Sequence, residues 1–177
     1  MKPVKSIAFL FLCGVLAWSC SDDDPAPVNE QETITRVTLT FTAGAAVDTY
    51  EYNVGETVPE IFMEQGTTYE VSITFEDASD PDDIEDITEE VEVEADDHYV
   101  FYQVTDASIM LENAADDVQD IDGTSIGLHT EWSTTGVENG TVTVYLIHEP
   151  TSKTGTVRDD FGGEDDVQVT FNVNIIK

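Results

Sequence analysis

Apolar and polar residues alternate along most of the chain after residue 33. In 36–42, apolar Val37, Leu39 and Phe41 are separated by polar residues rich in Thr, and 69–75 and 167–175 repeat the pattern. A period of two is typical of a strand with one buried face. Similar segments lie at 50–54, 61–63, 98–104, 106–112, 126–132 and 141–148, so the sequence predicts about nine short strands.

Two segments change this pattern. Between residues 77 and 97, Ile84, Ile87 and Val91 recur at helical spacing with acidic residues between them, which predicts a short helix over 87–94. Asn139 and Gly140 lie between the segments 126–132 and 141–148. This dipeptide suits the positive φ angles of a tight turn, so we expect a β-hairpin there.

These elements predict an all-β fold. Many short strands, separated by turn residues and accompanied by only one short helix, favour an antiparallel immunoglobulin-like β-sandwich, and an up-and-down barrel is the alternative. No repeat of constant period is visible, which argues against a propeller or a solenoid.

The first 20 residues have the pattern of an export signal. Lys2 and Lys5 precede an apolar run over 7–16, which is too short to span a bilayer as a helix. The segment 16–20, Leu-Ala-Trp-Ser-Cys, resembles the lipobox of bacterial lipoproteins. The resemblance implies cleavage before Cys20, a thioether-linked diacylglycerol on its thiol and a further acyl chain such as palmitate on the new amino terminus. An ordinary secretory signal with an incidental cysteine is the alternative.

Residues 21–32 are acidic, contain two prolines and have almost no apolar side chain, which predicts a linker. The triplet 22–24 resembles the acidic tag that sends some lipoproteins to the outer face of the outer membrane, and a plain solvated tether is the alternative. The sequence therefore predicts a signal peptide over 1–19, a lipidated linker over 20–32 and one β-sandwich domain over 33–177.

Charge and cysteine content restrict the function. The chain has 38 acidic and 6 basic residues and a net charge of −32. A field of this sign repels nucleic acid and anionic headgroups and attracts cations and basic protein surfaces. Both cysteines lie within the first 20 residues, so the predicted domain has no disulfide and no thiol chemistry.

No catalytic motif is visible. The chain has no G-x-S-x-G, HExxH, Walker or G-x-G-x-x-G sequence. Acidic residues are so frequent that a pair of carboxylates carries no information about glycoside hydrolysis. We therefore expect a protein that is not an enzyme.

The three histidines are candidate metal ligands. His98 begins a predicted strand, His129 lies within one with Glu131 on the same face, and His148 ends one before Glu149. If these strand ends meet at one edge of the sandwich, the three histidines converge with Glu131 or Glu149. Imidazole and carboxylate groups bind zinc, copper or iron where thiolates are absent. Strand parity places His148 on the apolar face of its strand but points His129 the opposite way, so three independent histidines remain the alternative.

Acid-rich loops are candidate calcium sites, because calcium prefers oxygen ligands. The two clusters are Asp80 with 82–83, and 159–160 with 164–166. Solvated surface acids are the alternative. The aromatic residues Trp132, Tyr99, Phe101, Tyr102 and Tyr145 are expected to form core and cross-strand contacts rather than a carbohydrate platform.

The segments 66–75, 85–91, 144–153 and 158–164 resemble a family of small lipoproteins of Bacteroidota-type bacteria, often labelled "type 1 periplasmic binding fold superfamily". That label implies a longer, two-domain α/β fold, whereas this pattern predicts strands. The resemblance implies a surface lipoprotein beside a TonB-dependent outer-membrane receptor that captures metal or another nutrient, and it carries over no site residues. A calcium-stabilised structural or adhesive module is the alternative function.

Overall fold

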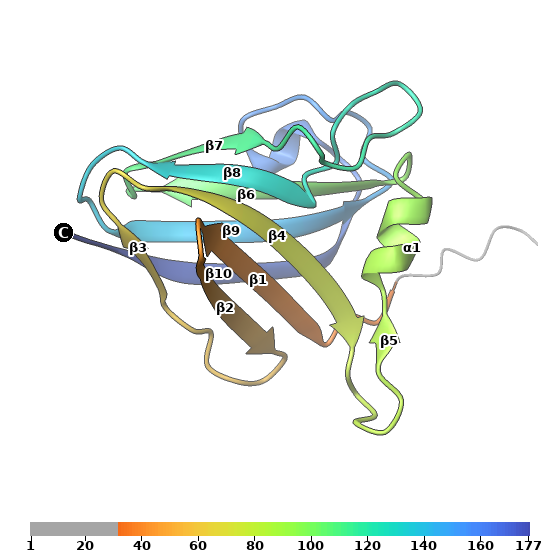
Figure 1. Cartoon of the computed structure of the whole chain (residues 1–177). Coiled ribbons are helices and arrows are strands. Elements are labelled where there is room, and N and C mark those ends of the chain that lie inside the picture. Colours follow the sequence, from red (N-terminus) through yellow and green to blue (C-terminus); the bar gives the residue numbers. More distant parts are fainter. Residues whose placement is uncertain (1–31) are drawn as a thin grey trace, which may run out of the picture. The chain divides into compact units, whose positions relative to one another are not determined.

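The computed structural model describes residues 32–177 (Figure 1). This part of the chain contains ten strands, one α-helix and one 3₁₀ turn, joined by loops. The elements are β1 (Arg36–Ala43), β2 (Ala46–Asn53), β3 (Ile61–Glu64), β4 (Thr68–Asp77), β5 (Glu85–Asp86), α1 (Thr88–Val93), β6 (His98–Thr105), β7 (Ile109–Asn113), β8 (His129–Thr134), β9 (Gly140–His148), η1 (Arg158–Asp160) and β10 (Glu164–Ile176).

The strands form two sheets. Sheet A has the order β2-β1-β4-β8-β7, with β5 paired to the end of β4, and sheet B has the order β3-β10-β9-β6. Every pairing is antiparallel except that of β3 with β10. The predicted all-β sandwich is therefore confirmed, and the barrel alternative is wrong because the described strands belong to two separate sheets.

The core lies between the sheets and follows the predicted alternation. Leu39 and Phe41 of β1 are buried, as are Val144 and Leu146 of β9. Trp132 of β8 is fully buried, and its ring contacts that of Phe41 edge to face at 5.1 Å. Burial of these alternating faces is the main force that holds the sheets together.

The aromatic residues pack against one another as expected. Tyr102 contacts Trp132 edge to face at 5.5 Å inside the sandwich. Phe101 and Tyr145 are direct cross-strand partners and stack at 6.0 Å. Phe161 covers Phe101 and Tyr99, so a second apolar cluster fixes the loop before β10 to sheet B.

The helix α1 lies within the predicted range 87–94 and is fixed by three buried residues. Ile87 and Val91 pack into the core, whereas Ile84 is exposed. Thr88 Oγ1 accepts a hydrogen bond from the Phe75 amide and donates one to the Phe75 carbonyl. The helix is thereby attached to the end of β4.

The hairpin expected at Asn139 and Gly140 is wrong. The strand β8 belongs to sheet A and β9 to sheet B, so this connection crosses from one sheet to the other. Asn139 Oδ1 accepts a hydrogen bond from the Ile175 amide of β10 at 2.9 Å. Gly140 lies so close to the Thr105 carbonyl that a Cβ atom would overlap it. A close backbone contact, and not a positive φ, therefore requires this glycine.

Some strand limits also differ from the prediction. The strand β7 begins at Ile109 instead of 106, because Asp106 has a φ of 61° and turns the chain after β6. The strand β8 covers 129–134 instead of 126–132. The last strand begins at Glu164, before the regular alternation of 167–175.

The predicted signal peptide, the lipidated Cys20 and most of the predicted linker lie outside the described residues. Glu32, expected in the linker, instead has its side chain packed into the folded domain, with 5% exposed. No helix in the described part of the chain has the length and apolar character needed to cross a membrane.

Candidate metal centre

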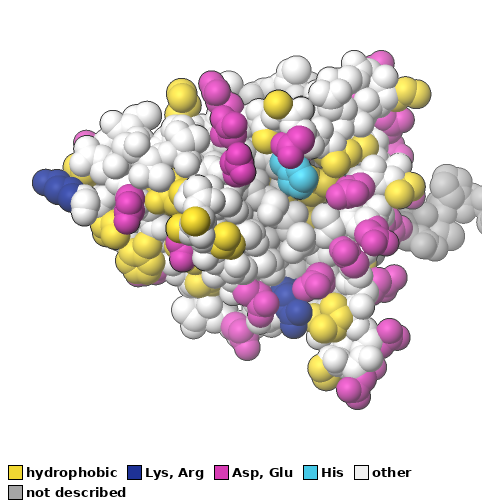
Figure 2. Space-filling view, in the orientation of Figure 1, with side chains coloured by type: hydrophobic (Ala, Val, Ile, Leu, Met, Phe, Trp, Pro, Cys, Tyr) yellow, Lys and Arg dark blue, Asp and Glu magenta, His cyan; other side chains and the backbone are white. Residues whose placement is uncertain are grey.

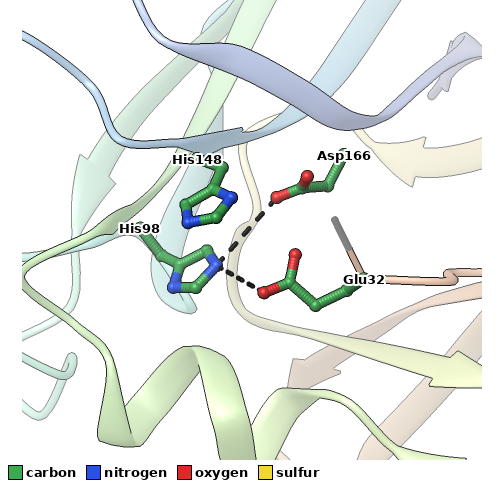
Figure 3. Close-up of side chains that lie close together, drawn as sticks. All are labelled: Glu32, His98, His148 and Asp166. Carbon is green, nitrogen blue, oxygen red and sulfur yellow. Dashed lines mark hydrogen bonds and ion pairs between the residues drawn. The ribbon is translucent and has the colours of Figure 1, made fainter. Parts of the chain in front are cut away.

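Two of the three histidines face each other across neighbouring strands of sheet B. His98 opens β6 and His148 closes β9, and the antiparallel register makes them direct partners. Their rings stack with centroids 5.0 Å apart and planes 11° apart. Both side chains therefore occupy the same end of the sheet (Figure 3).

The His98 ring is fixed from both sides. Its Nδ1 lies 3.1 Å from the Glu94 carbonyl oxygen, just after α1, and its Nε2 lies 3.2 Å from Glu32 Oε1. Because a carbonyl only accepts, the proton belongs on Nδ1. The lone pair of a neutral ring is then on Nε2 and points toward the carboxylates, as in histidine ligands whose other nitrogen donates to a carbonyl.

Asp166 reaches the same place through a β-bulge. In the β9–β10 ladder, Asp165 pairs with Ile147 and Val167 pairs with Leu146, so Asp166 is an additional residue between two ladder positions. Its Oδ2 lies 4.0 Å from His98 Nε2, and its side chain has no exposed surface. The bulge therefore directs a carboxylate inward next to the first core residue of β10.

Glu32 supplies the second carboxylate from a different part of the chain. It lies four residues before β1 and has the same parity as Ile34, which is buried. We call Glu32, His98, His148 and Asp166 the His–carboxylate cluster. One ligand atom from each of the four lies within 4.8 Å of the others (Figure 3).

The negative charges of the two carboxylates in this cluster are unfavourable in the absence of a cation. Glu32 Oε2 and both Asp166 oxygens are buried and have no hydrogen-bond partner. Burial and the charges of Glu32, Asp165 and Glu164 raise the pKa of Asp166 to about 8. Buried carboxylate oxygens normally have hydrogen bonds, a proton or a metal ion, and a cation could take the place of the proton that Asp166 holds below about pH 8.

Two imidazoles and two carboxylates are a donor set for a first-row transition metal. A tetrahedral zinc ion at about 2.1 Å from each ligand places the ligands about 3.4 Å apart. Because the ligand atoms lie no more than 4.8 Å apart, the side chains would move inward by at most about 1 Å on binding. Calcium fits poorly, since it takes six to eight oxygen ligands.

The loop before β10 holds Asp166 and His148 in place. Arg158 of η1 donates through Nη1 to the Gly162 carbonyl at 2.6 Å and through Nε to Asp165 Oδ1. Gly163 has a φ of 66°, and a Cβ atom there would overlap the His148 carbonyl oxygen. Only glycine therefore allows the loop to pass this close to the end of β9.

The structure does not bring His129 or Glu131 to this cluster. Both lie on β8 of sheet A, where Thr130 and Trp132 point into the core, so His129 and Glu131 point outward. His129 lines a shallow hollow with Glu131 on the outer face of the sheet and lies 4.0 Å from Asp116 Oδ2. His129 and Glu131 share a face, as predicted, and the structure brings together only two of the three candidate histidines, His98 and His148.

Asp and Glu side chains are spread over the face shown in Figure 2, with few Lys or Arg side chains.

Within residues 32–177, neither acid-rich loop that we considered for calcium forms a compact group of ligands by itself. From those loops only Asp166 converges with other ligands, and it does so with histidines. Glu149 is likewise outside the His–carboxylate cluster.

Sequence reasoning missed Glu32 and Asp166 as partners of the two histidines. The parity of Ile34, extended back by two residues, could have pointed to Glu32. Asp166 had no such signal, because regular alternation places Asp165, and not Asp166, on the face of Val167. A bulge reverses this assignment and is not visible in the alternation.

Comparisons with protein-family models, with curated proteins and with solved structures found no significant match to this chain. Its function is therefore inferred from the geometry of the His–carboxylate cluster.

Proposed function

We propose that this chain is a membrane-tethered protein that captures a divalent transition-metal ion, with Zn²⁺ as the best fit, in the His–carboxylate cluster. The observation that carries the proposal is the set of three buried carboxylate oxygens without hydrogen-bond partners beside two stacked imidazoles. A bound cation would satisfy these oxygens and offset the repulsion between the two carboxylates.

The geometry favours holding an ion over reacting with a substrate. The side chains of His98 and Asp166 have no exposed surface, that of Glu32 is 5% exposed, and His148 is half-buried. Four protein ligands in such an enclosed place resemble a closed zinc site, whereas a catalytic zinc keeps one position open. We therefore propose capture without a covalent step.

The proposed location and partner rest on the resemblance to bacterial lipoboxes and to small surface lipoproteins. Lipidation at Cys20 would attach the protein to the outer membrane, and the acidic triplet 22–24 supports the outward face. The net charge of −32 attracts cations. We propose that the captured ion passes to a receptor in the same membrane.

The proposal is tested by thermal unfolding of the purified full chain, first with EDTA and then with Zn²⁺, Mn²⁺, Co²⁺, Ni²⁺, Cu²⁺ or Ca²⁺. An ion bound only by the folded state raises Tm with concentration, and 100 times Kd corresponds to about 2.7 kcal/mol of added stability. We expect Zn²⁺ to raise Tm and Ca²⁺ to have little effect.

Two variants locate the site. Replacing both histidines, His98→Ala with His148→Ala, is expected to abolish the Zn²⁺ shift, and Glu32→Gln is expected to weaken it without creating a cavity. His129→Ala removes the remaining histidine and is the control that keeps the shift. A response to Ca²⁺ alone, no response to any transition metal, or a shift retained in the double variant would overturn the proposal.

A further inference from the structure

A second group of carboxylates lies directly beside the His–carboxylate cluster. Glu90 of α1 and Glu94, which ends the helix, are one turn apart and exposed. One carboxylate oxygen from each lies within 4.8 Å of the other and of an oxygen of Glu32. We call Glu32, Glu90 and Glu94 the outer group. Glu32 therefore belongs both to the outer group and to the His–carboxylate cluster.

The outer group is arranged against the usual electrostatics of a helix. Like charges four residues apart repel each other, and the carbonyl end of a helix disfavours negative side chains. Partial burial and the charges of Glu32, Glu94 and Glu85 raise the pKa of Glu90. Within α1 the last turn contains no basic residue that would compensate these charges.

An independent observation connects this acidic surface to a ligand. The Glu32 carboxylate, with its side chain only 5% exposed, has a buried Oε2 without a hydrogen-bond partner. Its Oε1 faces His98 Nε2. Glu32 thus lies between an exposed pair of carboxylates and two imidazoles, the buried His98 and the half-buried His148, and its Oε2 is free to bind a cation.

The helix also positions both groups together. The Glu94 carbonyl accepts a hydrogen bond from His98 Nδ1. Glu94 therefore contributes a carboxylate to the outer group and also orients the His98 ring of the His–carboxylate cluster. Burial of Ile87, Thr88 and Val91 holds the helix in place while Glu90 remains exposed. The distance between the groups is thereby set by the core and does not depend on the surface charges.

We propose that Glu90 and Glu94 form a loading site, at which a divalent cation binds before Glu32 transfers it to His98, His148 and Asp166. The inference rests on the proposed function and adds the path by which the ion reaches the His–carboxylate cluster. Carboxylates alone hold a transition metal weakly and exchange it quickly, whereas imidazole ligands hold it more tightly. Transfer requires only an exchange of ligands around the ion, so no bond in the protein is made or broken.

The test measures the kinetics of Zn²⁺ binding to the full chain by stopped flow, with a fluorescent zinc chelator as competitor. The test variant combines Glu90→Gln with Glu94→Gln. The matched control combines Glu89→Gln with Glu92→Gln, which removes the same charge from the same helix at exposed positions outside the outer group. Gln forms helices about as well as Glu, so α1 is expected to persist in both, as circular dichroism can check.

We expect the test variant to lower the association rate constant about tenfold and to weaken its dependence on ionic strength, because a local field that concentrates the ion has been removed. The dissociation rate constant is expected to fall in parallel, so that Kd changes little, since a loading site lies on the path in both directions. The control is expected to lower the association rate less than twofold.

Equal losses in both variants would show only a general effect of net charge and would overturn the loading site. An unchanged association rate, or a lower association rate with an unchanged dissociation rate and therefore a higher Kd, would also overturn it. In both cases normal Zn²⁺ binding by the unmodified chain would leave the proposed function standing. Absence of Zn²⁺ binding in the unmodified chain would overturn both proposals.

Discussion

His98 and His148 are direct partners in the β6–β9 ladder, and their rings stack at 5.0 Å. The neutral imidazole ring is the form that binds metal. The hydrogen bond from His98 Nδ1 to the Glu94 carbonyl leaves Nε2 as the ligand atom.

We therefore predict that Zn²⁺ binds His98 through Nε2 and leaves its Nδ1 protonated. The measurement is long-range proton–nitrogen NMR correlation of the ring nitrogens with and without one equivalent of Zn²⁺. The Nε2 resonance should move strongly while Nδ1 keeps the shift of a protonated, hydrogen-bonded nitrogen. The His129 ring serves as an internal control and should not change. Loss of the Nδ1 proton on Zn²⁺ addition would contradict the assigned geometry.

Removing the charge of Asp166 should stabilise the metal-free protein. Its two oxygens are buried without hydrogen-bond partners, so Asp166→Asn removes an unfavourable buried carboxylate. We expect a gain of about 1 to 3 kcal/mol in the free energy of unfolding in EDTA at pH 8, measured by urea denaturation.

The same variant should lose most of its Zn²⁺-induced rise in Tm, because a neutral amide is a poor ligand for the ion. Asp116→Asn is a suitable control, since the Asp116 side chain is 84% exposed and lies outside the His–carboxylate cluster. A destabilised Asp166→Asn variant that still binds Zn²⁺ normally would show that the carboxylate has a structural role instead.

The stability of the metal-free protein should depend on pH through Asp166. Burial and neighbouring carboxylates raise its pKa to about 8 in the folded state, whereas an unfolded aspartate titrates near about 3.9. Between these values the folded state holds the extra proton, so its stability falls as pH rises, by at most about 1.4 kcal/mol per pH unit from this group.

Urea unfolding of the unmodified chain and of Asp166→Asn, at a series of pH values from 4 to 9 in EDTA, isolates this effect. The difference in unfolding free energy between the two should grow with pH and level off above about pH 8. Curves that remain parallel over the whole range would mean that Asp166 does not keep its proton in the folded state.

The sequence predicted the strands well where one face of each strand is buried. In β1, β4 and β10 the alternation of apolar residues matches the buried positions, because burial against the other sheet selects apolar side chains at every second position. The helix was found for a related reason, since Ile87 and Val91 lie one turn apart and are both buried.

The parts that failed depend on contacts between distant segments. The Asn139–Gly140 connection has the local pattern of a hairpin turn, but the packing of β9 between β10 and β6 places the next strand in the other sheet. The sequence named both histidines of the candidate site, but their pairing depends on the β6–β9 register. Of the two carboxylates of the site, one is placed by a bulge in β10 and the other by the chain before β1. The register and the bulge leave no local signal, and only the parity of Ile34 points to Glu32.

Gly163 provides a last test of how the loop before β10 supports the site. Its φ of 66° disfavours any side chain, and a Cβ atom would also overlap the His148 carbonyl oxygen. Gly44 has a nearly equal φ of 61°, but no atom lies within 4 Å of the place that a Cβ atom would take, so Gly44→Ala measures the conformational penalty alone. That penalty is about 1 to 2 kcal/mol.

We predict that Gly163→Ala lowers the free energy of unfolding by at least about 1 kcal/mol more than Gly44→Ala, because the loop must move away from β9. The displacement should also weaken Zn²⁺ binding, since His148 and Asp166 lie on the two strands that the loop connects. Urea denaturation and Zn²⁺ titration of both variants check the two effects. Equal losses of stability with unchanged Zn²⁺ affinity would show that the loop can relax without disturbing the cluster.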